Sequence, residues 1–155
     1  MTANVEIVAS GYRWVGYGIR SFLSEIREML ITARNEVSMT VYIINDMEIV
    51  ELIKKVIDRG VFVEIFIYIP DYSGITDAAT KILGMKDRYP NLKVIEVNDE
   101  VVHAKVIVMD GRKVLVGSAN PTHAGFVTNY ELGLVVESVE IAQKITLLLR
   151  RLGER

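Results

Sequence analysis

The sequence has 155 residues, of which 50% are hydrophobic and 25% are charged, and it contains no cysteine. These proportions predict one globular domain spanning residues 1–155, and they exclude disulfide bonds and thiol catalysis. The formal net charge of -2 does not favour broad electrostatic binding of nucleic acid, because proteins that contact many phosphates are usually basic.

No apolar run approaches the ~18 residues that a membrane-spanning helix needs. Residues 1–6 contain neither the basic segment nor the continuous apolar segment of a signal peptide. We therefore expect a cytoplasmic protein without stable membrane association.

The first half of the chain alternates between strand-like and helix-like patterns. Runs of apolar and β-branched residues predict strands at 5–10, 39–44, 61–69 and 92–97. Apolar residues at helical spacing, with Ser21 and Asp46 as N-caps, predict helices at about 21–35, 45–59 and 76–88. A loop at 11–18 is rich in glycine and aromatic residues, which could either stack on a substrate base or pack against the core or a partner subunit.

The second half predicts three consecutive strands, at 101–109, 113–117 and 129–137, with a turn at Asp110-Gly111. A last helix follows Ser138, and its inward-facing residues are predicted to be Ile141, Ile145, Leu148 and Leu152. Together the elements predict an α/β fold with a mixed β-sheet flanked by helices on both faces. The sheet should be parallel early in the chain and antiparallel later.

Five polar side chains fall on or beside the three late strands, and their chemistry suits a phosphate group. Lys105 supplies a cation, while Ser118 and Asn120 supply neutral donors for phosphoryl oxygens. His103 can act as a nucleophile or a general acid, and Glu131 can hold one of its ring nitrogens. The competing interpretation is a buried histidine that Glu131 satisfies within an ordinary sheet. We expect neither a metal ion nor another cofactor, because no cysteine or second histidine lies near enough in sequence for a zinc site.

Six residues in this part of the chain have a spacing that forms a recognisable motif: His103, Lys105, Asp110, Gly117, Ser118 and Asn120. Six fixed positions match by chance at about 10⁻⁸ per starting position, if each residue type has ~5% usage. The pattern resembles the HKD motif of the phospholipase D superfamily, and the Asn129-x-Glu131 continuation is similar to the family's glutamate strand. The resemblance extends more loosely, as an order of strands and helices, over most of the chain.

This resemblance implies a metal-independent phosphodiesterase with a phospholipase D-like sandwich fold. The family's chemistry uses two histidines, one that attacks phosphorus to form a phosphohistidine and one that protonates the leaving oxygen. Because the motif occurs once, a homodimer would supply both copies of His103. His123, the other histidine, lies outside the motif and is treated as a bystander.

The short single-motif chain is most similar to the small endonucleases of the superfamily, which implies nucleic acid as the substrate. The resemblance assigns phosphoryl binding to Lys105, Asn120 and Ser118, and orientation of His103 to Glu131. The turn position of Asp110 suggests a structural role. Two alternatives stay open: hydrolysis of a phospholipid or another phosphodiester, and a catalytically weak dimeric binding module, which the acidic balance would suit.

Overall fold

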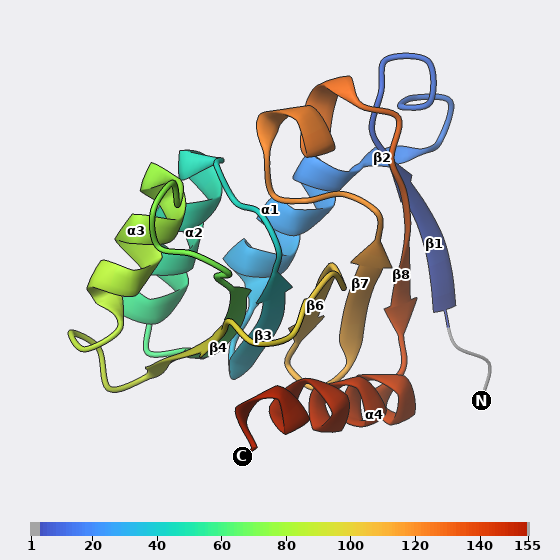
Figure 1. Cartoon of the computed structure of the whole chain (residues 1–155). Coiled ribbons are helices and arrows are strands. Elements are labelled where there is room, and N and C mark those ends of the chain that lie inside the picture. The colour runs from blue at the N-terminus through green and yellow to red at the C-terminus, as the bar shows by residue number, and fades with distance from the viewer. Residues whose placement is uncertain (1–3, 155) are drawn as a thin grey trace.

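A computed structural model describes residues 4–154, so the expectation drawn from residues 1–6 falls partly outside the described residues. All strands form one eight-stranded sheet with the order β2-β1-β8-β7-β6-β3-β4-β5 (Figure 1). The strands are β1 (Asn4–Ala9), β2 (Arg20–Ser21), β3 (Glu36–Val41), β4 (Phe62–Tyr68), β5 (Leu92–Val97), β6 (Val106–Met109), β7 (Lys113–Gly117) and β8 (Leu132–Glu137). The helices are α1 (Phe22–Thr32), α2 (Met47–Asp58), α3 (Asp77–Met85) and α4 (Val139–Arg150), with a π-helical turn η1 (Ala124–Thr128) and a 3-10 turn η2 (Arg151–Gly153).

The sheet is mixed in the way the sequence predicts. Strands β3, β4 and β5 are parallel, whereas β3, β6, β7, β8 and β1 pair in antiparallel succession. These directions bring the carboxyl ends of β1, β3, β4 and β7 to the same edge as the amino ends of β6 and β8. We call this edge the motif edge, and it lies at the top of the sheet in Figure 1.

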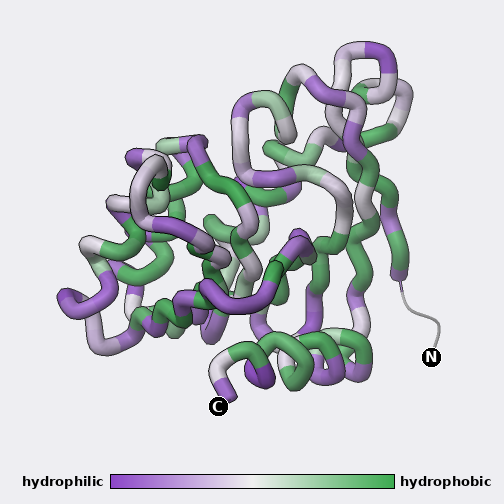
Figure 2. Tube along the Cα trace, viewed as in Figure 1, coloured by the Kyte–Doolittle hydropathy of each residue, from purple (hydrophilic) through white to green (hydrophobic). Residues whose placement is uncertain are grey.

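Helices cover both faces of the sheet, as predicted, but unequally. α1, α2 and α3 pack on one face over the large hydrophobic core, and α4 packs on the other face over β6 and β7. Figure 2 shows hydrophobic residues running along the strands and polar residues gathering in the connecting loops. Four helices begin at a side chain that accepts a hydrogen bond from a backbone N–H of the first turn, and these N-caps are Ser21, Asp46, Thr76 and Ser138.

Some local predictions differ from the structure. The strand expected at 39–44 is β3 at 36–41, and the strand expected at 129–137 begins only at Leu132. The strand expected at 101–109 is shorter, because β6 begins only at Val106. The face predicted for the last helix is right at Ile145, which packs partly buried against the valines of β6 and β7, and wrong at Ile141 and Leu148, which are 38% and 59% exposed. α4 buries Ala142, Thr146 and Leu149. Because the small side chain of Ala142 packs within the same valine cluster, the contact face lies around Ala142 and Thr146 rather than around Ile141 and Leu148.

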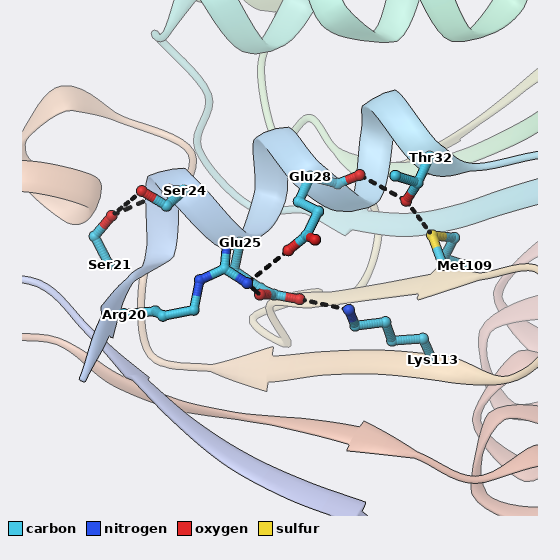
Figure 3. Close-up of polar contacts among 8 residues, drawn as sticks. All are labelled: Arg20, Ser21, Ser24, Glu25, Glu28, Thr32, Met109 and Lys113. Atoms are coloured by element: carbon cyan, nitrogen blue, oxygen red, sulfur yellow. Dashed lines mark hydrogen bonds and ion pairs between the residues drawn. The ribbon is translucent and has the colours of Figure 1, made fainter. Parts of the chain in front are cut away.

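A buried charge network joins α1 to β7 (Figure 3). The Glu25 side chain is 1% exposed, and its Oε2 accepts a hydrogen bond from Arg20 Nη1 at 2.6 Å. Lys113 Nζ lies 3.0 Å from Glu25 Oε1 as an ion pair, although its alignment is not that of a hydrogen bond. Removing one member of such a buried pair is costly, because the remaining charge has lost its compensation. The network therefore fixes the position of α1 over the strand that leads to the motif edge.

The turn between β6 and β7 lies at the far end of the strands from His103. Asp110 and Gly111 have φ angles of 54° and 64°, the left-handed backbone of a type I′ turn, and the Arg112 N–H donates to the Met109 carbonyl oxygen at 3.1 Å. The connection has three residues, since Met109 pairs with Lys113. The Asp110 carboxylate accepts hydrogen bonds from the backbone N–H groups of residues 34–36 at 2.8–3.2 Å. Seven residues of extended chain place Asp110 roughly 20 Å from His103. Its contacts support a structural role, namely attachment of the hairpin to the start of β3.

We expect Asp110→Ala to lower the free energy of unfolding by about 1–3 kcal/mol, because three backbone donors lose a charged acceptor and alanine is strained at positive φ. Asp110→Asn should lose less, since asparagine tolerates this backbone and keeps one acceptor oxygen. Urea denaturation measures both, with Asp58→Ala on the exposed face of α2 as the control. Equal stability of Asp110→Ala and Asp58→Ala would contradict the structural role.

Candidate active site

His103 and Lys105 lie together in the extended segment that enters β6 at the motif edge. The imidazole of His103 is exposed, and Lys105 Nζ lies 3.0 Å from its Nδ1 and 3.1 Å from its Nε2. The same ammonium group donates a hydrogen bond to the His103 carbonyl oxygen at 2.7 Å. An imidazole and a cation therefore face solvent side by side, as the sequence predicts.

The hydroxyl of Thr40, in β3, holds this segment in place. It donates to the carbonyl oxygen of Ala104 at 2.7 Å and accepts from the backbone N–H of Val106 at 3.1 Å. The edge of the His103 ring packs on Tyr42, with centroids 4.5 Å apart and an angle of 67° between the rings. No local sequence signal points to Thr40 or Tyr42, because their relation to His103 depends on the pairing of β3 with β6.

Gly117 ends β7, and Ser118 and Asn120 follow it at the same edge. A Cβ atom on Gly117 would lie 2.8 Å from Gly133 Cα and 2.9 Å from the Phe22 ring, so only glycine fits there. The two glycines are register partners on β7 and β8, and the ring of Phe22 presses on both. Sequence reasoning missed Gly133, although a glycine inside a predicted strand is a known sign of close approach.

The side chains after β7 keep polar groups free for a ligand. Asn120 Oδ1 is buried and has no hydrogen-bond partner among residues 4–154. Ser118 Oγ accepts from the N–H of Leu132 at 3.0 Å and lies 3.3 Å from Glu131 Oε1, to which it donates. A phosphoryl oxygen needs a donor, which the amide N–H groups of Asn120 or the hydroxyl of Ser118 can supply.

Glu131 precedes β8, and Ser10 positions it. The Ser10 hydroxyl is fully buried; it donates to the Asn129 carbonyl oxygen at 2.6 Å and accepts from the Glu131 N–H at 3.2 Å. Within the described chain, no hydrogen bond joins the Glu131 carboxylate to His103. That carboxylate instead acts electrostatically on Lys105. Orientation of His103 by Glu131 therefore stays a prediction.

Burial lowers the pKa of Lys105, and the negative charge of Glu131 opposes this shift by raising it. An ammonium group with a reduced hydration shell interacts more strongly with an incoming anion than a fully solvated one does. The arrangement therefore favours binding of a phosphate group between Lys105 and the donors that follow β7.

The remaining candidate residues lie outside this group. His123 is exposed at the start of η1, and no contact between its ring and His103 occurs in the part of the chain that is described. In the loop at 11–18, Trp14 packs edge-on against Tyr130 at 5.0 Å, while Tyr12 and Tyr17 are largely exposed. Among residues 4–154, no group of three or more histidine, cysteine or acidic side chains could hold a metal ion. No helix in the same range is long and apolar enough to cross a bilayer.

Residues 26–152 match the family model described as "Cardiolipin synthase, PLD-like domain". The curated DISARM protein DrmC from Bacillus paralicheniformis is 30% identical over 146 residues, which cover 90% of this chain and 59% of the relative. The chain therefore spans only about three fifths of that relative's length.

Two solved structures share the fold over nearly their whole length. NucT from Helicobacter pylori aligns with a TM-score of 0.79 and 24% identity, covering 99% of this chain and 97% of that chain. Nuc from Salmonella typhimurium, a phospholipase D family member, aligns with a TM-score of 0.79 and 19% identity, covering 97% and 93%. These two alignments show that the fold is shared. The chain belongs to the phospholipase D-like family, as the HKD pattern predicts.

The electrostatics of Lys105 predict a pH dependence. Phosphodiester hydrolysis should fall as the pH rises through the pKa of Lys105, and this fall should begin at a lower pH than for an exposed lysine, because burial lowers that pKa. Glu131→Gln removes the opposing charge, so the alkaline limb of its pH–rate profile should move to still lower pH. Initial rates of bis(p-nitrophenyl) phosphate hydrolysis, measured over a range of pH, locate the alkaline limb of the profile. Glu137→Gln, at the other end of β8, is the control, and an alkaline limb unmoved by Glu131→Gln would contradict the coupling.

Proposed function

We propose that this protein is a metal-independent nuclease that hydrolyses phosphodiester bonds through a phosphohistidine at a site shared by two copies of the chain. The observation that carries the proposal is the contact of about 3 Å between the exposed imidazole of His103 and the ammonium group of Lys105. This pair offers a nucleophile next to a charge that can stabilise phosphoryl oxygens, without need of a metal ion. The resemblance of a short single-motif chain to small endonucleases supports nucleic acid as substrate.

The reaction would proceed in two steps, formation and then hydrolysis of a phosphohistidine. A ring nitrogen of His103 attacks phosphorus, a P–N bond forms, and the P–O bond to the leaving group breaks. The imidazolium of His103 from a second copy gives its proton to the leaving oxygen. In the second step, the neutral imidazole of the second copy takes a proton from a water molecule, and the water oxygen attacks phosphorus. The P–N bond breaks, and both histidines return to their starting protonation states.

An exposed apolar face supports the shared site. Ile7, Leu134 and Val116 are successive register partners on β1, β8 and β7, and they are 48%, 42% and 39% exposed on the face that α4 only partly covers. Leu132 and Val5 extend the same face. This patch reaches the motif edge, because the residue after Val116 donates its N–H to the Lys105 carbonyl oxygen at 3.3 Å. Packing of two copies through this patch would bring the two motif edges together.

Two alternatives from the sequence remain. The description of the matching family model names cardiolipin synthase, so a phospholipid is the second candidate substrate. A weakly active dimeric binding module is the other, and the intact group of His103, Lys105, Asn120 and Glu131 argues against it. Measuring whether the protein hydrolyses nucleic acid, phospholipid or neither distinguishes a nuclease from these two alternatives.

We expect the purified protein to cleave DNA or RNA in excess EDTA, because Lys105 takes the place of a metal ion. Lys105→Ala should reduce the rate at least ~100-fold, the scale on which a preorganised charge acts, and His103→Asn should abolish cleavage. His123→Asn is the matched histidine control and should retain activity. Cleavage that EDTA stops and Mg²⁺ restores would contradict metal independence, and hydrolysis of phospholipid vesicles without nucleic-acid cleavage would favour the second candidate.

Mixing subunits tests whether two copies share the site. Equal amounts of wild-type and His103→Ala protein, unfolded together and refolded, should retain about a quarter of full activity, because only dimers of two wild-type chains carry both histidines. If each chain formed a complete site, about half would remain. A linear fall in activity with the mutant fraction would therefore reject the shared site and return His123 to consideration as the acid.

A further inference from the structure

A pair of stacked tyrosines continues from His103 along the motif edge. Tyr42 follows β3, Tyr68 ends β4, and the parallel register that pairs Val41 with Ile67 makes the two tyrosines neighbours. Their rings lie 5.6 Å apart at an angle of only 9°. Tyr42 also contacts His103, and Lys105 Nζ lies 5.3 Å from the centre of its ring. The candidate phosphate site therefore leads directly onto a flat aromatic surface.

This surface lines a groove at the carboxyl ends of β3 and β4. The groove has a volume of about 340 Å³, and its other walls come from the loop at 70–76 and the start of α3. Its lining includes Ile69, Pro70 and Ile75, together with the polar side chains of Ser73 and Thr76 and the carboxylate of Asp71, which accepts the Ser73 hydroxyl hydrogen at 2.7 Å. Both tyrosines are only half-buried, and within residues 4–154 neither hydroxyl forms a hydrogen bond. Such a mixture of flat aromatic, apolar and a few polar groups is typical of a site for a planar ligand.

We propose that this groove binds a nucleobase of the substrate, stacked beside Tyr42 and Tyr68, while the adjoining phosphate lies at His103 and Lys105. The inference rests on the proposed function and extends it to the form of the substrate. A base inside a duplex has both faces covered by its neighbours, so only an unpaired base can stack on protein side chains. The site should therefore take single-stranded nucleic acid in preference to a duplex.

Stacked rings favour a base over a lipid chain as the occupant. An acyl chain gains only from apolar area and would bind without regard to ring geometry. A base gains additionally from face-to-face contact with an aromatic ring. Tyr42 and Tyr68 stack on each other and Lys105 lies over the Tyr42 ring, so a base would stack on the outer face of Tyr68. The position of the groove beside the phosphate site matches a ligand in which a planar group and a phosphate are linked through a sugar.

The test compares two oligonucleotides of equal length, oligothymidylate and a strand of abasic sites that keeps every phosphate. Fluorescence anisotropy measures binding to His103→Asn protein, which prevents cleavage. Tyr68→Ala in this background should weaken oligothymidylate binding roughly 5- to 150-fold, the range for loss of one base–aromatic stack. The affinity for the abasic strand should not change, and Tyr68→Phe should restore binding of oligothymidylate.

Tyr72→Ala is the matched control, because Tyr72 is exposed on the same loop but donates its hydroxyl hydrogen to Glu96 and does not line the groove. Equal losses for both oligonucleotides, or none for either, would overturn the base site. So would a Tyr68→Ala protein that loses binding to cardiolipin vesicles but not to oligothymidylate. Thermal melting of each variant identifies simple misfolding, in which case Tyr68→Leu, which keeps apolar bulk, gives the same comparison.

The readout also separates this inference from the proposed nuclease. Base-dependent binding without cleavage by the wild-type chain would uphold the groove and refute the nuclease. Cleavage of nucleic acid by a protein whose binding does not change in Tyr68→Ala would uphold the nuclease and refute the groove.

Discussion

The alternating direction of β6, β7 and β8 is the constraint on which the candidate site depends. His103 and Lys105 precede β6, Ser118 follows β7 and Glu131 precedes β8, so antiparallel pairing brings all of them to one edge. The spacing from His103 to Ser118 is the length of a short extended segment, a strand, a three-residue turn and a second strand. A one-residue slip of this hairpin would turn each side chain to the other face. The type I′ turn at Asp110, attached to the start of β3, opposes such a slip.

The site also depends on groups that do no chemistry. Gly117 and Gly133 let β7 and β8 meet under the ring of Phe22. The ion pair between the buried carboxylate of Glu25 and the half-buried Lys113 holds α1 in the place from which Phe22 reaches the two glycines. The hydroxyls of Thr40 and Ser10 secure the two segments that have left the regular sheet. These contacts fix the backbone that carries the motif and leave its polar side chains accessible to a ligand. Preorganisation of this kind limits the reorganisation that a reacting phosphate would require.

The sequence predicted the mixed sheet, the helix caps and the motif, because each leaves a local signal: alternation, a capping side chain or a fixed spacing. It misjudged residues 101–105, since alternation of apolar residues continues past the point where pairing ends at Val106. It misplaced part of the buried face of α4, because Leu147, Leu148 and Leu149 are consecutive and apolar spacing does not decide which of them is buried. Packing on the valines of β6 and β7 selected Ala142. Tyr42 and Tyr68 lie 26 residues apart in sequence. Only the parallel register of β3 and β4 makes them neighbours, and no local pattern carries that information.

The charge balance of the chain bears on how a nucleic acid would be held. A net charge of -2 offers little long-range attraction to a polyanion, so short-range contacts must supply most of the affinity. Stacking on aromatic rings is one such contact, and it weakens little with salt. If two copies share a phosphate at a two-fold axis, each contributes a groove lined by Tyr42 and Tyr68 on its own side of that phosphate. The bases on both sides of the cleaved bond would then each find a tyrosine pair. A phospholipid headgroup would supply the phosphate but no ring for either groove, and for this reason the geometry of the aromatic pairs favours a single nucleic-acid strand.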